Sequence, residues 1–140
     1  MYQTITIIGN LGRDPESKQA KNGKTYALFS VAASRSIGNG QKETAWFSVS
    51  AWEKTGQYVC QYAQKGSLVM VTGRLAFDPQ TGGPRLWVDQ NGNTRAPFEV
   101  IAGEVKILNG FKTEEQRNQT PQYQTQQRQA PQQETFEEYY

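Results

Sequence analysis

Five short segments rich in β-branched and aromatic residues follow one another along the first 110 residues, and turn residues separate them. This pattern is typical of an all-β domain. The predicted strands span residues 2–12, 26–33, 44–52, 68–77 and 98–108. Asn22-Gly23 predicts a hairpin turn, and the glycine, proline and asparagine residues within 37–42, 78–84 and 90–93 predict loops.

One helical pattern interrupts the series of strands. Tyr58, Val59, Tyr62 and Ala63 recur with the spacing of a single apolar helix face. Residue Thr55 is the expected N-cap of this helix, and the expected end is at Gly66. A helix that follows three strands and precedes the others predicts a five-stranded OB-fold barrel, in which the helix lies between strands three and four.

The third predicted strand carries the most informative side chains. Side chains alternate between two faces along a strand, so its phenylalanine, valine and alanine are expected to face the barrel core. Trp46 and Trp52 then share the solvent-facing side with two serines. Tryptophans separated by small side chains suit a platform on which nucleotide bases stack, and each stacked base contributes about 1–3 kcal/mol. The alternative is that these tryptophans pack beneath a loop or against a partner subunit.

Four further residues are candidates for contact with a nucleic acid. Trp87 lies in a second strand-like stretch together with Arg85, although tryptophan is also common in protein cores. Lys54 and Lys65 lie at the two ends of the predicted helix, where they could neutralise phosphates. The alternative for each cation is an ordinary solvated surface residue. The candidate nucleic-acid-binding residues are therefore Trp46, Trp52, Trp87, Lys54, Lys65 and Arg85.

The composition of the chain changes sharply near Gly110. The last thirty residues contain nine Gln and two Pro but almost no aliphatic side chains, so they cannot bury enough apolar surface to offset the entropy lost on ordering. Residues 1–110 are therefore predicted to form one domain, and residues 111–140 a disordered tail. The tail ends in an acidic and aromatic segment that is a candidate site for partner proteins, formed by Phe136, Glu137, Glu138, Tyr139 and Tyr140.

The formal net charge of +2 conceals an asymmetry between these two segments. Residues 1–110 contain 12 Lys/Arg and 8 Asp/Glu, a net charge of +4, whereas residues 111–140 contain 3 Lys/Arg and 5 Asp/Glu, a net charge of −2. A basic domain with an acidic end indicates contact with nucleic acid together with an interaction tail.

Absent residue types exclude several classes of function. The chain has no histidine and a single cysteine, Cys60, which excludes the usual zinc ligand sets, a Ser-His-Asp triad and an internal disulfide. We expect no metal, no cofactor and no catalytic residue. The sequence shows neither a signal-peptide pattern nor a long apolar run, so we expect a cytoplasmic, nucleoid-associated protein without membrane contact.

Several motifs, in their order along the chain, resemble those of bacterial single-stranded DNA-binding proteins. The opening strand reads IIGNLGRDPE at residues 7–16, and further matches fall at 44–52, 62–66, 71–75, 87–92 and 98–100. The resemblance covers essentially all of residues 1–110. It implies an OB barrel, a single-stranded DNA ligand and a homotetramer, in which the first strand pairs between subunits and Phe47 lies close to the dimer interface.

The resemblance also bears on individual residues. It implies that the three tryptophans stack bases and that Lys54, Lys65 and, less securely, Arg85 lie near the DNA path. A further stacking aromatic of some members would fall near Ile37, where this chain has an aliphatic residue. Family tails usually end in aspartates closed by Pro-Phe, whereas residues 136–140 contain glutamates and no terminal Pro-Phe. Residues 136–140 therefore keep the acidic and aromatic character of such tails but depart from their usual docking sequence.

Three classes of function compete on this sequence. The first is sequence-tolerant binding of single-stranded DNA in replication, recombination and repair. The second is an RNA-binding OB-fold module, because stacking on aromatic side chains does not read the sugar. The third, a carboxylate-metal nuclease, needs clustered acidic residues, and the sequence contains no such cluster. The order of the motifs and the acidic tail favour the first class.

Overall fold

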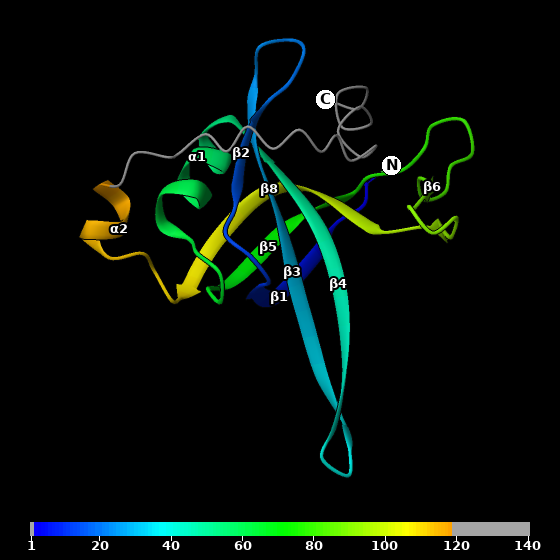
Figure 1. The fold of residues 1–140 in the computed structure, drawn as a ribbon, viewed down its shortest axis with the longest axis horizontal. Coiled ribbons are helices and arrows are strands. Elements are labelled where there is room, and N and C mark those ends of the chain that lie inside the picture. The colour runs from blue at the N-terminus through cyan, green and yellow to red at the C-terminus, as the bar shows by residue number, and fades with distance from the viewer. Residues whose placement is uncertain (1, 119–140) are drawn as a thin grey trace.

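Successive side chains of a β-strand point to opposite faces, so a segment in which apolar residues alternate with polar ones can bury one face in a core. The computed structural model describes residues 2–118. Its strands are β1 (Ile5–Leu11), β2 (Glu16–Gln19), β3 (Thr25–Gly38), β4 (Gln41–Trp52), β5 (Leu68–Leu75), β6 (Trp87–Val88), β7 (Thr94–Arg95) and β8 (Phe98–Asn109). Its helices are α1 (Glu53–Tyr62) and α2 (Glu114–Asn118), as Figure 1 shows.

Five strands close into a barrel. The large sheet has the order β1-β5-β8-β4-β3-β2, and β1 also pairs with β3 at Asn10↔Ala32 and Leu11↔Val31. The pairing of β1 with β3 closes the sheet into a barrel, because β1 is the first strand in this order and β3 is the last but one. Strand β2 remains outside the barrel, paired only with β3. In chain order α1 lies between the third and fourth barrel strands, β4 and β5. The predicted OB-fold barrel is therefore confirmed.

Glycine permits the close approach at which the barrel closes. A Cβ atom on Gly9 would lie 2.2 Å from the backbone oxygen of Ala32, a distance that only the absence of a side chain allows. Inside the barrel, Phe29, Val31, Val49, Val71 and Val100 are completely or almost completely buried. Alternate residues of β3, β4, β5 and β8 thus meet in one core, as their hydrophobic pattern requires.

Helix α1 differs at both ends from the sequence prediction. Trp52 is the N-cap and provides no side-chain hydrogen bond, so Thr55 lies within the helix rather than capping it. The chain passes directly from β4 into α1 and leaves no room for a separate capping residue. The helix ends at Tyr62 because Ala63 adopts an extended conformation that buries its methyl group in the core. Gly66 lies beyond this end, in a turn, with φ +88°.

The segment 37–42 is mostly strand and not the predicted loop. Strands β3 and β4 pair as far as Gly38↔Gln41 and form a long arm that stands away from the barrel in Figure 1. Only Asn39 and Gly40 form the turn, with φ values of 52° and 71°. Both faces of this arm are exposed, so neither face needs apolar side chains. The sequence of the arm therefore lacks the alternation of apolar and polar residues by which a strand is predicted.

Residues 111–118 are ordered against α1, although the sequence analysis assigned them to the disordered tail. The backbone N–H of Lys112 donates to the carbonyl oxygen of Tyr62 at 2.8 Å, and its Nζ donates to that of Cys60 at 2.8 Å. The Arg117 guanidinium lies 5.3 Å from the centre of the Tyr62 ring. These contacts supply partners to the last carbonyls of α1, which the helix itself leaves unpaired. The rest of the predicted tail, residues 119–140, lies outside the described residues.

Candidate nucleic-acid interface

The outer face of the barrel has a defined register across β3, β4 and β8. Ser30 pairs with Ser48, and Ser48 pairs with Glu99. The next row along consists of Leu28, Ser50 and Ile101, and Tyr26 pairs with Trp52 in the row beyond. Trp46 comes before the first of these rows and pairs with Ala32. The two tryptophans of β4 therefore lie at opposite ends of one face, as the alternation predicted.

Trp46 is the exposed aromatic of this face. Its relative accessibility is 55%. Its ring lies against the turn after β1, because a Cβ atom on Gly12 would be only 2.6 Å from Trp46 Cζ3. The same Cβ would be 3.0 Å from Trp46 Cη2, so the ring packs directly over the backbone of Gly12. Trp46 thus offers a large apolar surface to solvent on a rigid strand.

Trp52 does not face solvent, and the sequence expectation of an exposed side chain is wrong here. Its relative accessibility is 5%, and its ring lies against Tyr26 with centroids 4.6 Å apart and planes inclined by 31°. Both aromatics belong to a buried cluster with Ala20, Leu28, Ala76 and Ile101. The outer face of the barrel carries a second small core at this end, so the same alternation places Trp52 among apolar neighbours.

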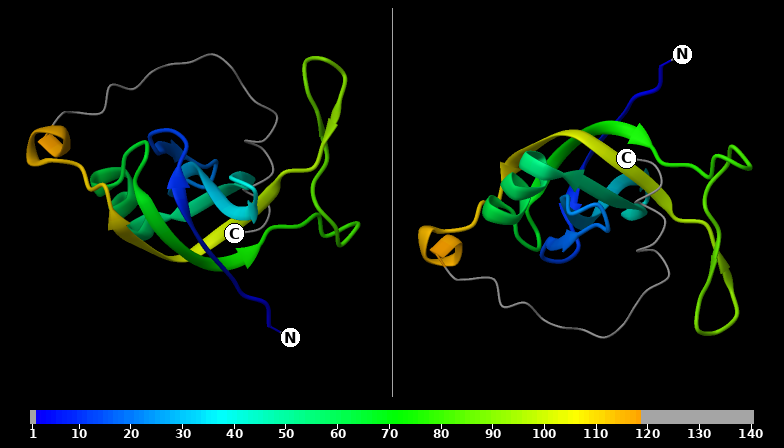
Figure 2. Two further views of the ribbon diagram at one scale, coloured as in Figure 1. Left: turned by 90° about the horizontal axis from the view of Figure 1, so that it is seen from below. Right: turned by 90° about the horizontal axis from the view of Figure 1, so that it is seen from above.

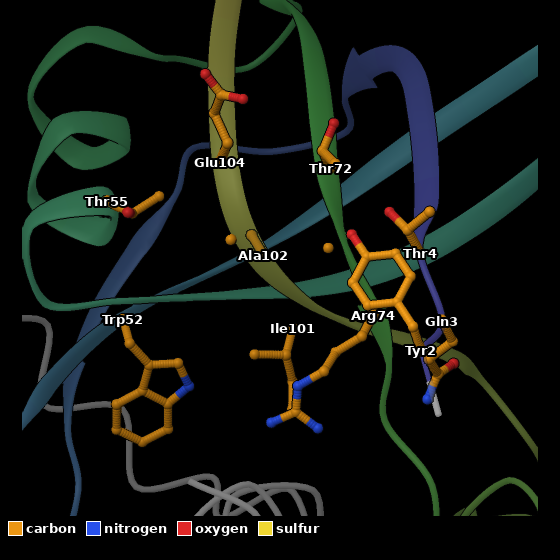
Figure 3. Close-up of a pocket in the computed structure, with 12 residues that line it drawn as sticks. Tyr2, Gln3, Thr4, Trp52, Thr55, Thr72, Arg74, Ile101, Ala102 and Glu104 are labelled. Carbon is orange, nitrogen blue, oxygen red and sulfur yellow. The ribbon is translucent and has the colours of Figure 1, made fainter.

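A groove of about 510 Å³ adjoins Trp52 and crosses the outer side of β5 and β8. Its lining includes Tyr2, Thr55, Arg74, Ile101 and Glu104. Figure 3 shows Trp52 and Arg74 on either side of Ile101, with Thr55 of α1 on the helix side. No local pattern in the sequence indicates Arg74 as a groove residue, because only the register Arg74↔Ile101 brings this part of β5 to the groove.

Arg85 is buried and is not the exposed cation that the sequence suggested. Its relative accessibility is 8%, and its Nε donates to Glu99 Oε2 at 3.0 Å. Glu99 is itself 5% exposed. Burial raises the pKa of the Glu99 carboxyl above its ordinary value, and the charge and hydrogen bond of Arg85 oppose that shift. The guanidinium already has a carboxylate partner, which the sequence could not reveal.

Trp87 is half-buried at the start of a small hairpin formed by β6 and β7. The hairpin turn is held by Asp89, whose Oδ1 accepts from the backbone N–H groups of Asn91 and Asn93 at 2.9 Å. Arg95 Nε donates to Asp89 Oδ2 at 2.8 Å. The backbone hydrogen bond from Asn93, more than any other interaction, lowers the pKa of the Asp89 carboxyl. Asp89 therefore organises a turn, in agreement with the predicted loop at 90–93.

The two candidate lysines are both exposed and lie near opposite ends of the face. Lys54 follows Trp52 by two residues, at the start of α1. The backbone N–H of Lys65 donates to Asp14 Oδ1 at 2.7 Å, which places Lys65 beside the turn that supports Trp46. Lys54 therefore lies close to Trp52 in the chain, and Lys65, three residues after the end of α1, lies close to the turn beneath Trp46.

Two further features of the described part of the chain concern alternative functions. Within residues 2–118, no three His, Cys, Asp or Glu side chains are grouped so that they could hold a metal ion. No helix in the same range is long and apolar enough to cross a bilayer.

Comparison with known proteins gives a consistent result. The model of the single-strand binding protein family matches residues 2–108. The single-stranded DNA-binding protein of Neisseria meningitidis is 34% identical over 110 residues, which cover 76% of this chain and 59% of the meningococcal protein. Single-stranded DNA-binding protein 1 of Lactococcus lactis is 29% identical and covers 94% of this chain and 84% of its own.

The protein of the same name from Xylella fastidiosa is 32% identical over 140 residues, with 94% of this chain and 81% of the relative covered. The chain therefore spans most of two relatives but only 59% of the meningococcal protein. The family match covers the barrel except the last residue of β8, and it includes both tryptophans of β4. This chain belongs to the single-strand binding protein family, a family of binding proteins rather than enzymes.

Proposed function

We propose that this protein binds single-stranded DNA without sequence preference and protects it during replication, recombination and repair. The observation that carries the proposal is the exposed Trp46 ring, which packs over Gly12 on the outer face of the barrel. An exposed aromatic on a rigid strand offers a stacking surface to any base, because every base has a π-face. The family match and the printed names of the relatives support DNA as the ligand.

The proposed path of the strand runs along the outer face from Trp46 toward the groove beside Trp52. Small side chains, Ser30 and Ser48, leave room for bases next to Trp46. The edge of Trp52 and the guanidinium of Arg74 line the groove at the other end. Lys54 and Lys65 neutralise phosphates at the two ends, and Trp87 contributes a further aromatic surface from the β6–β7 hairpin.

Titration with dT homopolymers tests the function, with tryptophan fluorescence and anisotropy of a labelled oligonucleotide as two independent signals. We expect saturable binding and strong quenching of tryptophan emission. A matched rU oligonucleotide distinguishes DNA binding from the RNA-binding alternative, and tighter binding of the RNA would contradict the proposal. Incubation of labelled DNA with magnesium tests the nuclease alternative, for which shortened products would be the evidence.

We propose a homo-oligomer, a tetramer as the family resemblance implies, for the functional assembly. Ile8 in the middle of β1 is 55% exposed, and Phe98 beside Phe47 is also exposed, with ring centroids 5.6 Å apart. Such apolar surface on a barrel strand suits pairing with a second copy. Light scattering of the full chain tests the assembly, and a monomeric mass at micromolar concentration would contradict it.

The acidic and aromatic segment at residues 136–140 remains a candidate docking site for replication and repair proteins. Phe136, Glu137, Glu138, Tyr139 and Tyr140 lie outside the described residues. We propose a cytoplasmic, nucleoid-associated location, in keeping with the proposed DNA ligand. Pull-down from nuclease-treated lysate with the full chain and a variant that ends at residue 118 tests the docking role, which requires partners that only the full chain recovers.

A further inference from the structure

A long connection between β5 and β8 carries Trp87, and its buried residues are Ala76 and Arg85. Strand β5 ends at Leu75 and β8 begins at Phe98, with the β6–β7 hairpin between them. Figure 2 shows this hairpin projecting from the barrel on the side opposite α2. Leu86 and Val88, the two neighbours of Trp87, are both exposed. The position of the Trp87 ring therefore depends on whatever fixes the connection to the barrel.

Glu99 on β8 fixes the connection at two points. Its backbone oxygen accepts from the N–H of Ala76 at 2.9 Å, just after the end of β5. Its carboxylate accepts from Arg85 Nε at 3.0 Å, two residues before Trp87. Both charged side chains are more than nine-tenths buried. Removal of either partner of a buried ion pair leaves an uncompensated charge, so the pair strongly favours this one arrangement of the connection.

The pair also lies on the outer face that the DNA is proposed to follow. Glu99 pairs with Ser48 in the register of β4 and β8, and Ser48 is two residues from Trp46 on the same face. A connection anchored here holds Arg85, two residues before Trp87, against this face. An unanchored connection would have to be ordered each time DNA binds, at an entropy cost that weakens affinity.

We propose that Arg85 and Glu99 are positioning residues for single-stranded DNA binding, which hold the β6–β7 hairpin so that Trp87 can stack on the bound strand. This inference rests on the proposed function. Arg85 acts through Glu99 and does not neutralise a phosphate. The position of Trp87 is thus set before DNA arrives, and the hairpin contributes a stacking surface without a separate folding step.

Of two single variants, Glu99→Gln gives opposite results for a positioning residue and for a phosphate ligand. If the pair positions the hairpin, Arg85→Gln and Glu99→Gln both raise the Kd for oligo(dT) by about 2- to 10-fold, the cost of ordering a released segment. If Arg85 contacts a phosphate instead, Glu99→Gln releases Arg85 and leaves the affinity unchanged or tighter. A neutral or tighter Glu99→Gln variant would overturn the proposal.

The salt dependence of binding supplies a second readout that a merely structural role does not move. Loss of one phosphate contact lowers the slope of log K against log salt by about 0.7 for single strands. We expect Arg85→Gln to leave this slope unchanged, and a decrease of that size would also overturn the proposal. The double variant Arg85→Met with Glu99→Leu replaces the pair with apolar side chains, and it permits the slope to be measured if a single variant does not fold.

A protein with Trp87 as its single tryptophan reports the position of the ring directly. In that background, made with Trp46→Phe and Trp52→Phe, we expect Glu99→Gln to increase acrylamide quenching of Trp87 and to reduce its quenching by DNA. Arg35→Gln is the matched control, because it breaks an exposed ion pair with Glu43 in the β3–β4 arm, outside the β5–β8 connection. Equal effects of the two variants would overturn the proposal, whereas failure of the unmodified protein to bind oligo(dT) would instead overturn the proposed function.

Discussion

The two ends of the outer face of β4 have the same pattern of side chains but different surroundings. Trp46 and Trp52 are six residues apart and point to the same side of the sheet. Trp46 is 55% exposed above Gly12, whereas Trp52 is 5% exposed against Tyr26. The alternation of a strand thus determines the side on which a residue lies, and residues distant in sequence determine whether that side is covered. The same substitution at Trp46 and at Trp52 should therefore have different effects on folding and on DNA binding.

Truncation of Trp52 should have the largest effect on folding. We expect Trp52→Ala to lower the free energy of unfolding by about 3–5 kcal/mol, because the change opens a cavity in the cluster with Tyr26 and Ile101. Trp46→Ala is the control, and it should change the free energy of unfolding far less because its ring is exposed. Urea denaturation followed by circular dichroism measures both values. Equal losses would mean that the two ends do not differ.

Truncation of Trp46 should have the largest effect on DNA binding by the folded protein. We expect Trp46→Ala to weaken oligo(dT) binding by about 1–3 kcal/mol, the contribution of one stacked base. The conservative variant Trp46→Phe should retain most of the affinity, since phenylalanine keeps an aromatic face. Anisotropy titrations with labelled oligonucleotide provide the constants. Binding that is unaffected by Trp46→Ala would exclude this ring from the DNA path.

A methyl group beneath Trp46 should reduce affinity without removal of the ring. We expect Gly12→Ala to displace Trp46 and weaken DNA binding by less than Trp46→Ala does, because the added Cβ would lie 2.6 Å from the ring. The same change in a Trp46→Ala background should have no further effect on affinity, as two residues in contact are not additive. Additive losses in this double-mutant cycle would show that Gly12 acts independently of the ring.

The sequence predicted the parts of this molecule that depend on local patterns. Alternation along residues 44–52 identifies β4 and its two faces, and the spacing of Tyr58, Val59, Tyr62 and Ala63 identifies α1. Coverage of a face depends on partners from other elements, and no local pattern contains them. Trp52 is covered by Ala20 and Ile101, and Arg85 is neutralised by Glu99, all of which are distant from them in sequence.

The segment that follows β8 illustrates the same limit at the domain boundary. Its polar composition predicts disorder from residue 111, since it has almost no apolar side chains to bury. The structure instead orders residues 111–118 through hydrogen bonds to the carbonyl ends of α1, with Lys112 as the main contact. Composition measures what a segment can bury, whereas these contacts depend on unpaired backbone groups elsewhere in the fold.

The smallest expected effect concerns the lysines at the two ends of the face. Lys65 lies beside the turn beneath Trp46, and Lys54 lies two residues after Trp52. If the strand passes both tryptophans, Lys54→Gln and Lys65→Gln each lower the salt slope of binding by about 0.7. Arg35→Gln, in which an exposed cation of the β3–β4 arm is removed, should leave the slope unchanged and serves as the control. A reduced slope for Lys65→Gln alone would confine the DNA path to the Trp46 end. Trp52 would then contribute to folding and not to binding, and the two ends of β4 would differ in function as well as in exposure.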